Sequence, residues 1–233
     1  EQYCTVMAAT NFDRIILFLK SFQAGRVKTR LAARLGDRGA LNVYAAMVAD
    51  LLDKLNPLRS ILVPYFDAPP DPSDHPPAVT SLMSRGLLRI QRGRDLGERM
   101  SNAFHEIFAG GVERAVLIGS DIPQIDGELL KAFLRKLRTL PTVIGPAVDG
   151  GYYLIGFQRR HFDPSVFRDI EWSTENVLAQ TLERIRSLEL GCYIGKELQD
   201  VDTVEDLESL AASGPSTGSL AEVLERYLVH AET

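Results

Sequence analysis

The chain has 233 residues, which is long enough to bury one large α/β core without disulfides or a structural metal. Its 31 acidic and 26 basic residues give a net charge of −5, so we expect no nucleic-acid partner. Cys4 and Cys192 are too few and too far apart for a zinc site or a disulfide framework, which suits a reducing compartment. Because no secretory leader and no apolar run of about 20 residues is present, we expect a cytoplasmic protein without a membrane span.

Predicted strands and helices alternate along the chain. An apolar run at 14–20 predicts the first strand, and helical spacing at 41–55 predicts a helix with Asp37 as its candidate N-cap. Prolines at 68–77 predict a surface loop. Further strands are expected at 60–66, 115–118, 142–145, 152–157 and 192–194, and further helices at 96–107, 126–138, 174–188, 204–212 and 220–230. This alternation predicts a mostly parallel open sheet with helices on both faces.

The chain is expected to fold as a single α/β domain at 14–208. The remainder, 209–233, is expected to form a polar hinge and a C-terminal helix that docks on this domain. Ser219 and Glu222 have the spacing of a capping box, which predicts the start of that helix.

A basic segment at 20–30 directly follows the first predicted strand. Ligands of open α/β sheets bind beyond the carboxyl ends of the strands, so this position favours a ligand site. Lys20, Lys28 and Arg30 suit phosphate oxygens, and Gly25 lets the backbone approach a ligand closely. A solvated surface loop is the alternative explanation. The spacing excludes a P-loop, and no glycine-rich dinucleotide fingerprint follows a strand.

Carboxylates follow two other predicted elements. Asp121 comes after the strand at 115–118, and Asp200 and Asp202 would share one face of an extended segment. Mg²⁺ commonly takes one or two protein carboxylates together with substrate phosphates, so these residues are candidate metal ligands. The alternative is that they cap helices or form turns, a role we assign to Asp206. Asparagine would preserve such capping while removing the anionic ligand.

Two further segments are candidates for the acceptor side of a site. Gly150 and Gly151 predict a tight turn that presents Asp149 and an aromatic wall from Tyr152. The segment Trp172-Ser173 lies before a predicted helix and is a candidate lining of a sugar or phosphate pocket. A plain β-turn and a buried Trp beside a Ser cap are the alternatives. The four histidines lack the spacing of a triad or metal site, and we assign them no role.

Five segments, taken in order, resemble the DUF2064 family. They are Gly25 to Leu31, Gln91 to Met100, Gly119 to Pro123, Gly145 to Leu154 and Asp200 to Thr203. Members of this family are described as glycosyltransferases of the GT-A fold, and the resemblance spans about 15–207. Phe22 and Ala24 stand where the family usually has prolines, and Ile122 stands where a cysteine is common.

The resemblance implies a nucleotide-diphospho-sugar transferase fold over 14–208, with the nucleotide under the first loop and a metal bridging its phosphates. Asp121 matches the family's strand-end aspartate, and Asp202 matches the late aspartate of related nucleotidyltransferases. On this basis we expect Asp121 and Asp202 to hold Mg²⁺ or Mn²⁺. Asp149 is then the candidate base or acceptor contact.

Three functions remain open. The leading one is metal-dependent transfer of a sugar from a nucleoside diphosphate sugar to a small acceptor. The second is nucleotidyl transfer with release of pyrophosphate, because the 20–30 loop is also similar to that of 2-phospholactate guanylyltransferases. The third is a catalytically silent nucleotide-binding module. The base, sugar, acceptor, stereochemistry and oligomeric state stay undetermined by the sequence.

Overall fold

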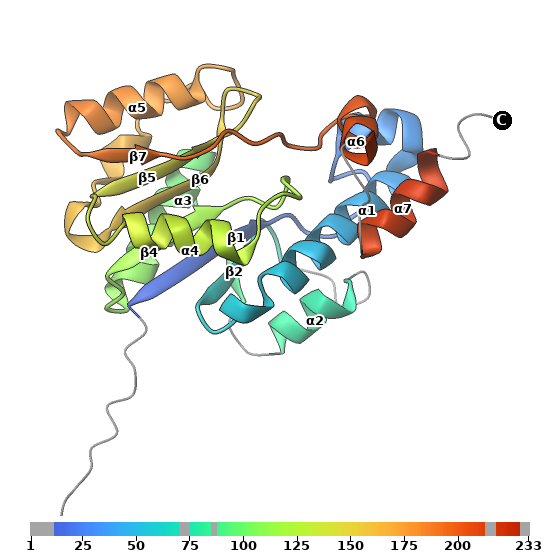
Figure 1. The fold of residues 1–233 in the computed structure, drawn as a ribbon, viewed down its shortest axis with the longest axis horizontal. Coiled ribbons are helices and arrows are strands. Elements are labelled where there is room, and N and C mark those ends of the chain that lie inside the picture. Colours follow the sequence, from blue (N-terminus) through green and yellow to red (C-terminus); the bar gives the residue numbers. More distant parts are fainter. Residues whose placement is uncertain (1–11, 70–74, 85–87, 213–217, 229–233) are drawn as a thin grey trace, which may run out of the picture.

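A central sheet organises the molecule (Figure 1), whose computed structural model describes residues 12–69, 75–84, 88–212 and 218–228. The sheet has seven strands in the order β3-β2-β1-β4-β6-β5-β7. The strands are β1 (Asp13–Leu19), β2 (Leu62–Phe66), β3 (Arg89–Ile90), β4 (Arg114–Ile118), β5 (Thr142–Pro146), β6 (Tyr152–Gln158) and β7 (Cys192–Ile194). The predicted mostly parallel α/β sheet is confirmed.

Strand β6 is the exception, because it runs antiparallel to both of its neighbours, β4 and β5. Only the turn at 147–151 separates β5 from β6, and a parallel crossover needs a dozen or more residues. The short connection therefore dictates an antiparallel pair, which the hydrophobic pattern alone did not distinguish. As a result, β6 begins at the edge of the sheet where the parallel strands end.

Helices cover both faces of the sheet. They are α1 (Thr29–Lys54), α2 (Pro77–Met83), α3 (Leu96–Ala109), α4 (Gly127–Lys136), α5 (Val177–Ser187), α6 (Val204–Ala212) and α7 (Ser219–Leu228), with short 3-10 turns at Asn56–Leu58, Arg159–His161 and Pro164–Phe167. Alternate residues of β1 reach opposite layers: Ile15 and Leu17 pack with α1, α2 and α4, whereas Ile16 and Phe18 pack with α3 and α5.

Helices α1, α6 and α7 form a third apolar cluster beside the sheet (Figure 1). The N–H groups of Ser219 and Leu220 donate to the carboxylate of Asp50 in α1, at 2.8 and 3.0 Å. The cap of α7 therefore comes from another helix and not from the predicted capping box of Ser219 and Glu222. The predicted hinge residues 213–217 lie outside the described residues.

The N-terminal half departs from the prediction in two places. Helix α1 begins at Thr29, and the backbone breaks at Gly36 (φ 72°), so Asp37 follows a break inside the helix and is not its N-cap. Helix α2 and the two-residue strand β3 were not predicted, and the proline-rich stretch lies partly outside the described residues. None of the helices in the described ranges is long and apolar enough to cross a membrane.

Candidate functional site

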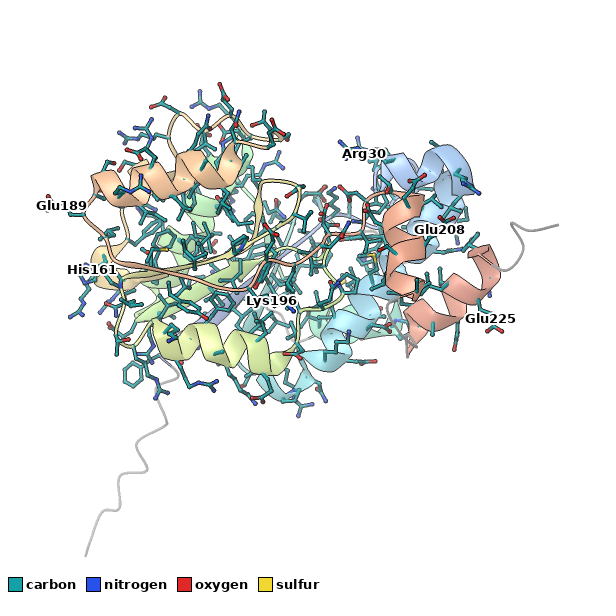
Figure 2. All side chains as sticks on the ribbon, turned by 45° about the horizontal axis from the view of Figure 1, so that its top comes forward. Arg30, His161, Glu189, Lys196, Glu208 and Glu225 are labelled. Atoms are coloured by element: carbon teal, nitrogen blue, oxygen red, sulfur yellow. The ribbon has the colours of Figure 1, made fainter. Side chains whose placement is uncertain are left out.

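Loops from distant parts of the sequence meet at one edge of the sheet. The segment that links β7 to α6 crosses this edge, as the position of Lys196 in Figure 2 shows. Its backbone is fixed there, because the N–H of Leu198 donates to the carbonyl of Pro146 (3.1 Å) and that of Val201 to the carbonyl of Asp121 (3.0 Å). The loops after β4, β5 and β7 are thereby held side by side.

Lys28 lies at the centre of this edge and contacts both predicted metal ligands. Its Nζ is 2.5 Å from Oδ1 of Asp121 and 2.8 Å from Oδ1 of Asp202. The Lys28 side chain is 1% exposed, whereas the Asp121 and Asp202 side chains are 36% and 41% exposed. Three elements supply the cluster, since Lys28 precedes α1, Asp121 follows β4 and Asp202 precedes α6. The sequence predicted a phosphate contact for Lys28 and a metal-binding role for the two carboxylates, whereas the structure brings Lys28 into contact with both of them.

Mutual attraction favours the charged forms of Lys28 and Asp121. Burial lowers the pKa of Lys28, but the charges of Asp121 and Asp202 outweigh burial and raise it above its usual range. Burial likewise opposes the charge of Asp121, yet Lys28, and then Lys20, hold the pKa of that carboxyl below its usual range. One ammonium and two carboxylates therefore leave the cluster with a net negative charge at neutral pH.

The carboxylate of Asp202 is not used to cap α6. Asp206 accepts from the N–H groups of Asp202 (3.1 Å) and Thr203 (2.8 Å), and the Asp206 N–H donates to Oγ1 of Thr203 (3.2 Å). This reciprocal arrangement satisfies the helix start and confirms the capping role predicted for Asp206. Asp202 is consequently available for Lys28 or a ligand.

The loop at 20–28 carries the other predicted phosphate contacts. Lys20 is exposed, and its backbone N–H donates to the hydroxyl of Tyr44 (2.8 Å), which also lies 3.4 Å from Oγ of Ser120. Gly25 has a φ of 79°, and an added Cβ would lie 3.3 Å from Oδ2 of Asp37. Tyr44 thus joins the ends of β1 and β4, a role that the apolar helical pattern of α1 did not reveal.

The start of α1 lies directly after Lys28. Lys28 is the N-cap residue of α1, and its side chain forms no hydrogen bond with the first amides of the helix. Arg30 is exposed in the first turn, and Figure 2 shows it on the same side of the molecule as Glu208 of α6. His161 and Glu189 lie at the opposite end. The first amides of α1 and the exposed Arg30 therefore follow Lys28 directly in the chain.

The turn between β5 and β6 presents a second group of carboxylates. Oδ1 of Asp149 accepts from the N–H of Gly151 (2.8 Å), and Gly150 (φ 86°) packs so closely on Glu175 that a Cβ would overlap its backbone. Burial, followed by the charges of Asp149 and Asp202, raises the pKa of Asp200. Asp200 and Asp149 thus repel each other beside the Lys28 cluster.

The aromatic residues predicted for the acceptor side face the interior. The hydroxyl of Tyr152 lies 4.0 Å from Sδ of Met100, and Trp172 packs so tightly on Gly97 that an added Cβ would meet its ring at 2.7 Å. Both belong to the apolar layer of α3 and α5. Ser173 (φ 66°) does not cap α5, which begins only at Val177.

Two residues near this edge were not predicted from the sequence. Nε2 of Gln91 donates to the carbonyls of Leu19 (3.2 Å) and Tyr65 (3.0 Å), and Oδ1 of Asp67 accepts from the N–H of Ser21 (2.6 Å). Both side chains fix the ends of β1 and β2. The Gln91 to Met100 motif was a signal for the first of them, but its role required the structure.

The donor set fits a hard cation only in part. Within the described ranges, no group of three or more His, Cys, Asp and Glu side chains is arranged to hold a metal ion. Asp121 and Asp202 nevertheless offer two carboxylates about one point, which is the number of protein ligands that Mg²⁺ commonly takes when phosphates complete its shell.

Known proteins share this architecture. A family profile described as "Uncharacterized protein conserved in bacteria (DUF2064)" matches residues 70–174. A crystal structure from Desulfovibrio desulfuricans G20, provisionally described as a nucleotide-diphospho-sugar transferase, is 35% identical, with a TM-score of 0.82, over 92% of this chain and 94% of that chain. This chain belongs to the DUF2064 family. The DUF2064 protein has the nucleotide-diphospho-sugar transferase fold that the sequence predicted.

More distant structures agree with the DUF2064 protein in fold alone. One is a 4-diphosphocytidyl-2C-methyl-D-erythritol synthase from Anaerococcus prevotii DSM 20548, 11% identical with a TM-score of 0.55 over 87% of this chain and 96% of that chain. Another is a CMP:2-keto-3-deoxy-manno-octonic acid synthetase complexed with CTP, 13% identical with a TM-score of 0.52 over 86% and 97%. A comparison with curated proteins gave no match.

Proposed function

We propose that this DUF2064 protein is a metal-dependent glycosyltransferase that moves a sugar from a nucleoside diphosphate sugar to a small acceptor. The observation that carries the proposal is the cluster of Lys28, Asp121 and Asp202 at the strand ends, where ligands of such sheets bind. The 35% identical relative, provisionally described as a nucleotide-diphospho-sugar transferase, supports the same substrate class.

The diphosphate is placed at the start of α1. Its oxygens would accept from the N-terminal amides of the helix and from Lys20 and Arg30, since both side chains are exposed there. Asp121 and Asp202 would hold Mg²⁺ or Mn²⁺ against the same phosphates, because a cation is needed between anions of like charge. A divalent cation bound there supplies positive charge that stabilises the departing nucleoside diphosphate.

The acceptor is placed beside the β5–β6 turn. In the transfer, the acceptor oxygen bonds to the anomeric carbon, the bond from that carbon to the diphosphate breaks, and the hydroxyl proton goes to a base. Asp149 is exposed and its Oδ1 is oriented by the N–H of Gly151, so we assign it as this base or as an acceptor contact. Gly150 and Gly151 let the turn approach the sugar, and Ser173 is the remaining polar candidate near it.

Nucleotidyl transfer is the second candidate. The exposed cations of the 20–30 loop can neutralise a triphosphate as well as a diphosphate, and Lys28 lies where its charge reaches the same phosphates. In that reaction a phosphate oxygen of the acceptor attacks the α-phosphorus, and pyrophosphate leaves. The two reactions therefore differ in the product that is released.

Product analysis tests the proposal. The protein is incubated with Mn²⁺ and either nucleoside diphosphate sugars with small hydroxylated acceptors or nucleoside triphosphates with sugar phosphates. We expect release of a nucleoside diphosphate and loss of most of that release in Asp121→Asn, by about 1,000-fold if the cation contributes about 4 kcal/mol. Asp126→Asn is the matched control, because Asp126 lies in the same loop and caps α4.

Three outcomes would correct the proposal. Pyrophosphate instead of nucleoside diphosphate assigns the protein to nucleotidyl transfer. Nucleotide binding with neither product assigns it to a silent binding module. Equal activity in Asp121→Asn and Asp126→Asn moves the reacting centre away from Asp121.

A further inference from the structure

The ammonium of Lys28 lies where a cation shared by Asp121 and Asp202 would have to lie. Its Nζ contacts Oδ1 of both carboxylates, at 2.5 and 2.8 Å. A Mg²⁺ ion binds carboxylate oxygens at about 2.0–2.1 Å, so an ion that bridged these two oxygens would need the volume that Nζ fills. An ammonium and a divalent cation at such separations also repel each other strongly. The two cations therefore exclude each other from this position.

Burial makes Lys28 dependent on its anionic partners. The Lys28 side chain is 1% exposed, and its ammonium has two anionic partners, Asp121 and Asp202. An ammonium this deeply buried needs paired anions, because leaving it unpaired in a low-dielectric environment is costly. Leaving the carboxylates therefore costs least when Lys28 gains another anion, and the phosphates proposed at the start of α1 are the nearest ones that the site would bind.

We infer that Lys28 occupies the divalent-cation position in the free protein and that the cation enters by exchanging with it, so that metal and nucleotide bind together. The inference rests on the proposed nucleotide site and adds the order in which its charges assemble. The incoming cation takes Asp121 and Asp202, and the released ammonium pairs with the phosphates. Each ligand thus raises the affinity for the other, which is a reciprocal coupling.

Metal binding to the nucleotide-free protein tests the exchange without any turnover. Mn²⁺ binding is measured by calorimetry for wild type, Lys28→Met and Lys20→Met. We expect Lys28→Met to bind Mn²⁺ about 5- to 150-fold more tightly than wild type, the usual range of a coupling between sites. Lys20→Met is the matched control, since it removes the same charge from the same loop without the contacts to the carboxylates, and its gain is expected to be much smaller.

The result that would overturn the exchange is an unchanged or weaker affinity in Lys28→Met. An equal gain in Lys20→Met would overturn it too, because the effect would then be one of net charge and not of position. Absence of Mn²⁺ binding in all three proteins would have the same consequence.

A footprint of the wild-type protein gives an independent test that does not depend on the folding of a variant. Lysines are acetylated and located by mass spectrometry in the free protein, with saturating Mn²⁺, and with Mn²⁺ plus nucleoside diphosphate. We expect exposed Lys20 to react in the free protein while Lys28 is protected, Mn²⁺ alone to make Lys28 reactive, and the nucleotide to restore protection. Protection of Lys28 that persists in the Mn²⁺-bound protein would overturn the exchange.

The exchange and the proposed function can fail separately. Turnover with a Lys28 that stays protected would overturn the exchange and leave the proposed function standing, whereas exchange without turnover would leave the exchange standing.

Discussion

Two groups of aspartates share one edge of the sheet and are in opposite electrostatic states. Asp121 and Asp202 face the buried ammonium of Lys28, which lowers the pKa of Asp121 against the effect of burial. Asp200 faces Asp149 and Asp202, and burial together with these charges raises its pKa. Residue type therefore does not determine the charge balance of a site, because Lys28 forms its ion pairs with Asp121 and Asp202, whereas burial and like charges dominate at Asp200.

Removing both carboxylates that pair with Lys28 is expected to have the largest effect on stability. The double variant Asp121→Asn/Asp202→Asn leaves the Lys28 ammonium buried without an anion, which typically costs about 3–5 kcal/mol. For a domain of this size, that lowers the melting temperature by roughly 6–20 °C. Adding Lys28→Met should recover most of the loss, because an apolar side chain of similar volume can replace a buried charge. A wild-type melting temperature for the double variant would contradict the ion-pair cluster.

This expectation differs from the one that follows from the sequence alone. If Asp121 and Asp202 were metal ligands and nothing more, asparagine at either position would leave the stability of the ligand-free protein nearly unchanged. The structure gives each carboxylate a second role as partner of Lys28. We therefore expect each single substitution to cost about 1.5–3 kcal/mol, the value of a charge-assisted contact.

Arg30→Ala separates binding from folding at the same edge. Arg30 is exposed in the first turn of α1, so its loss should change stability by less than about 0.5 kcal/mol. Loss of a charge-assisted phosphate contact should weaken nucleotide binding by about 1.5–3 kcal/mol, or roughly 10- to 150-fold. Calorimetry measures the affinity, and Arg135→Ala on α4 is the control. Equal affinities in the two variants would place the phosphates elsewhere.

Substitutions of Asp206 distinguish a carboxylate that caps a helix from one that is available to a ligand. Asp206→Ala removes the cap of α6 and should cost about 1 kcal/mol in denaturant unfolding, whereas Asp206→Asn should retain most of that stability. Wild-type stability of the alanine variant would show that the cap contributes nothing.

The smallest effect on stability is expected at Asp200, where like charges are close together. The folded-state pKa of Asp200 is raised, so the folded protein binds this proton more tightly than the unfolded chain, and the residue lowers stability as the pH rises through that pKa. Asp200→Asn should therefore raise the free energy of unfolding slightly at pH 7, by about 0.5 kcal/mol at most, and the gain should vanish towards pH 4. Melting curves across this range check the sign, and a destabilised variant at pH 7 would contradict it.

Local patterns predicted the sheet and the positions of its ligand-binding loops, because apolar runs identify buried strands and ligands bind beyond their ends. The orientation of Lys28 was beyond such patterns, since it depends on a left-handed backbone (φ 47°) and on two segments distant in sequence. The inward packing of Trp172 likewise depends on a segment distant in sequence, because its ring lies against Gly97. The antiparallel orientation of β6 could have been predicted from the sequence, because the short turn before it excludes a parallel crossover.

Nucleotide-induced stabilisation shows whether this edge of the sheet binds a nucleotide and a metal together. Melting temperatures are measured with uridine, guanosine, adenosine and cytidine diphosphates, with and without Mg²⁺ or Mn²⁺, for wild type and Asp202→Asn. A ligand at 100 times its Kd contributes about 2.7 kcal/mol, so we predict a rise of roughly 5–10 °C for the cognate nucleotide with metal. The metal-dependent part of that rise should be lost in Asp202→Asn. If no nucleotide moves the wild-type melting temperature under any metal condition, the edge formed by Lys28, Asp121 and Asp202 is not a nucleotide site.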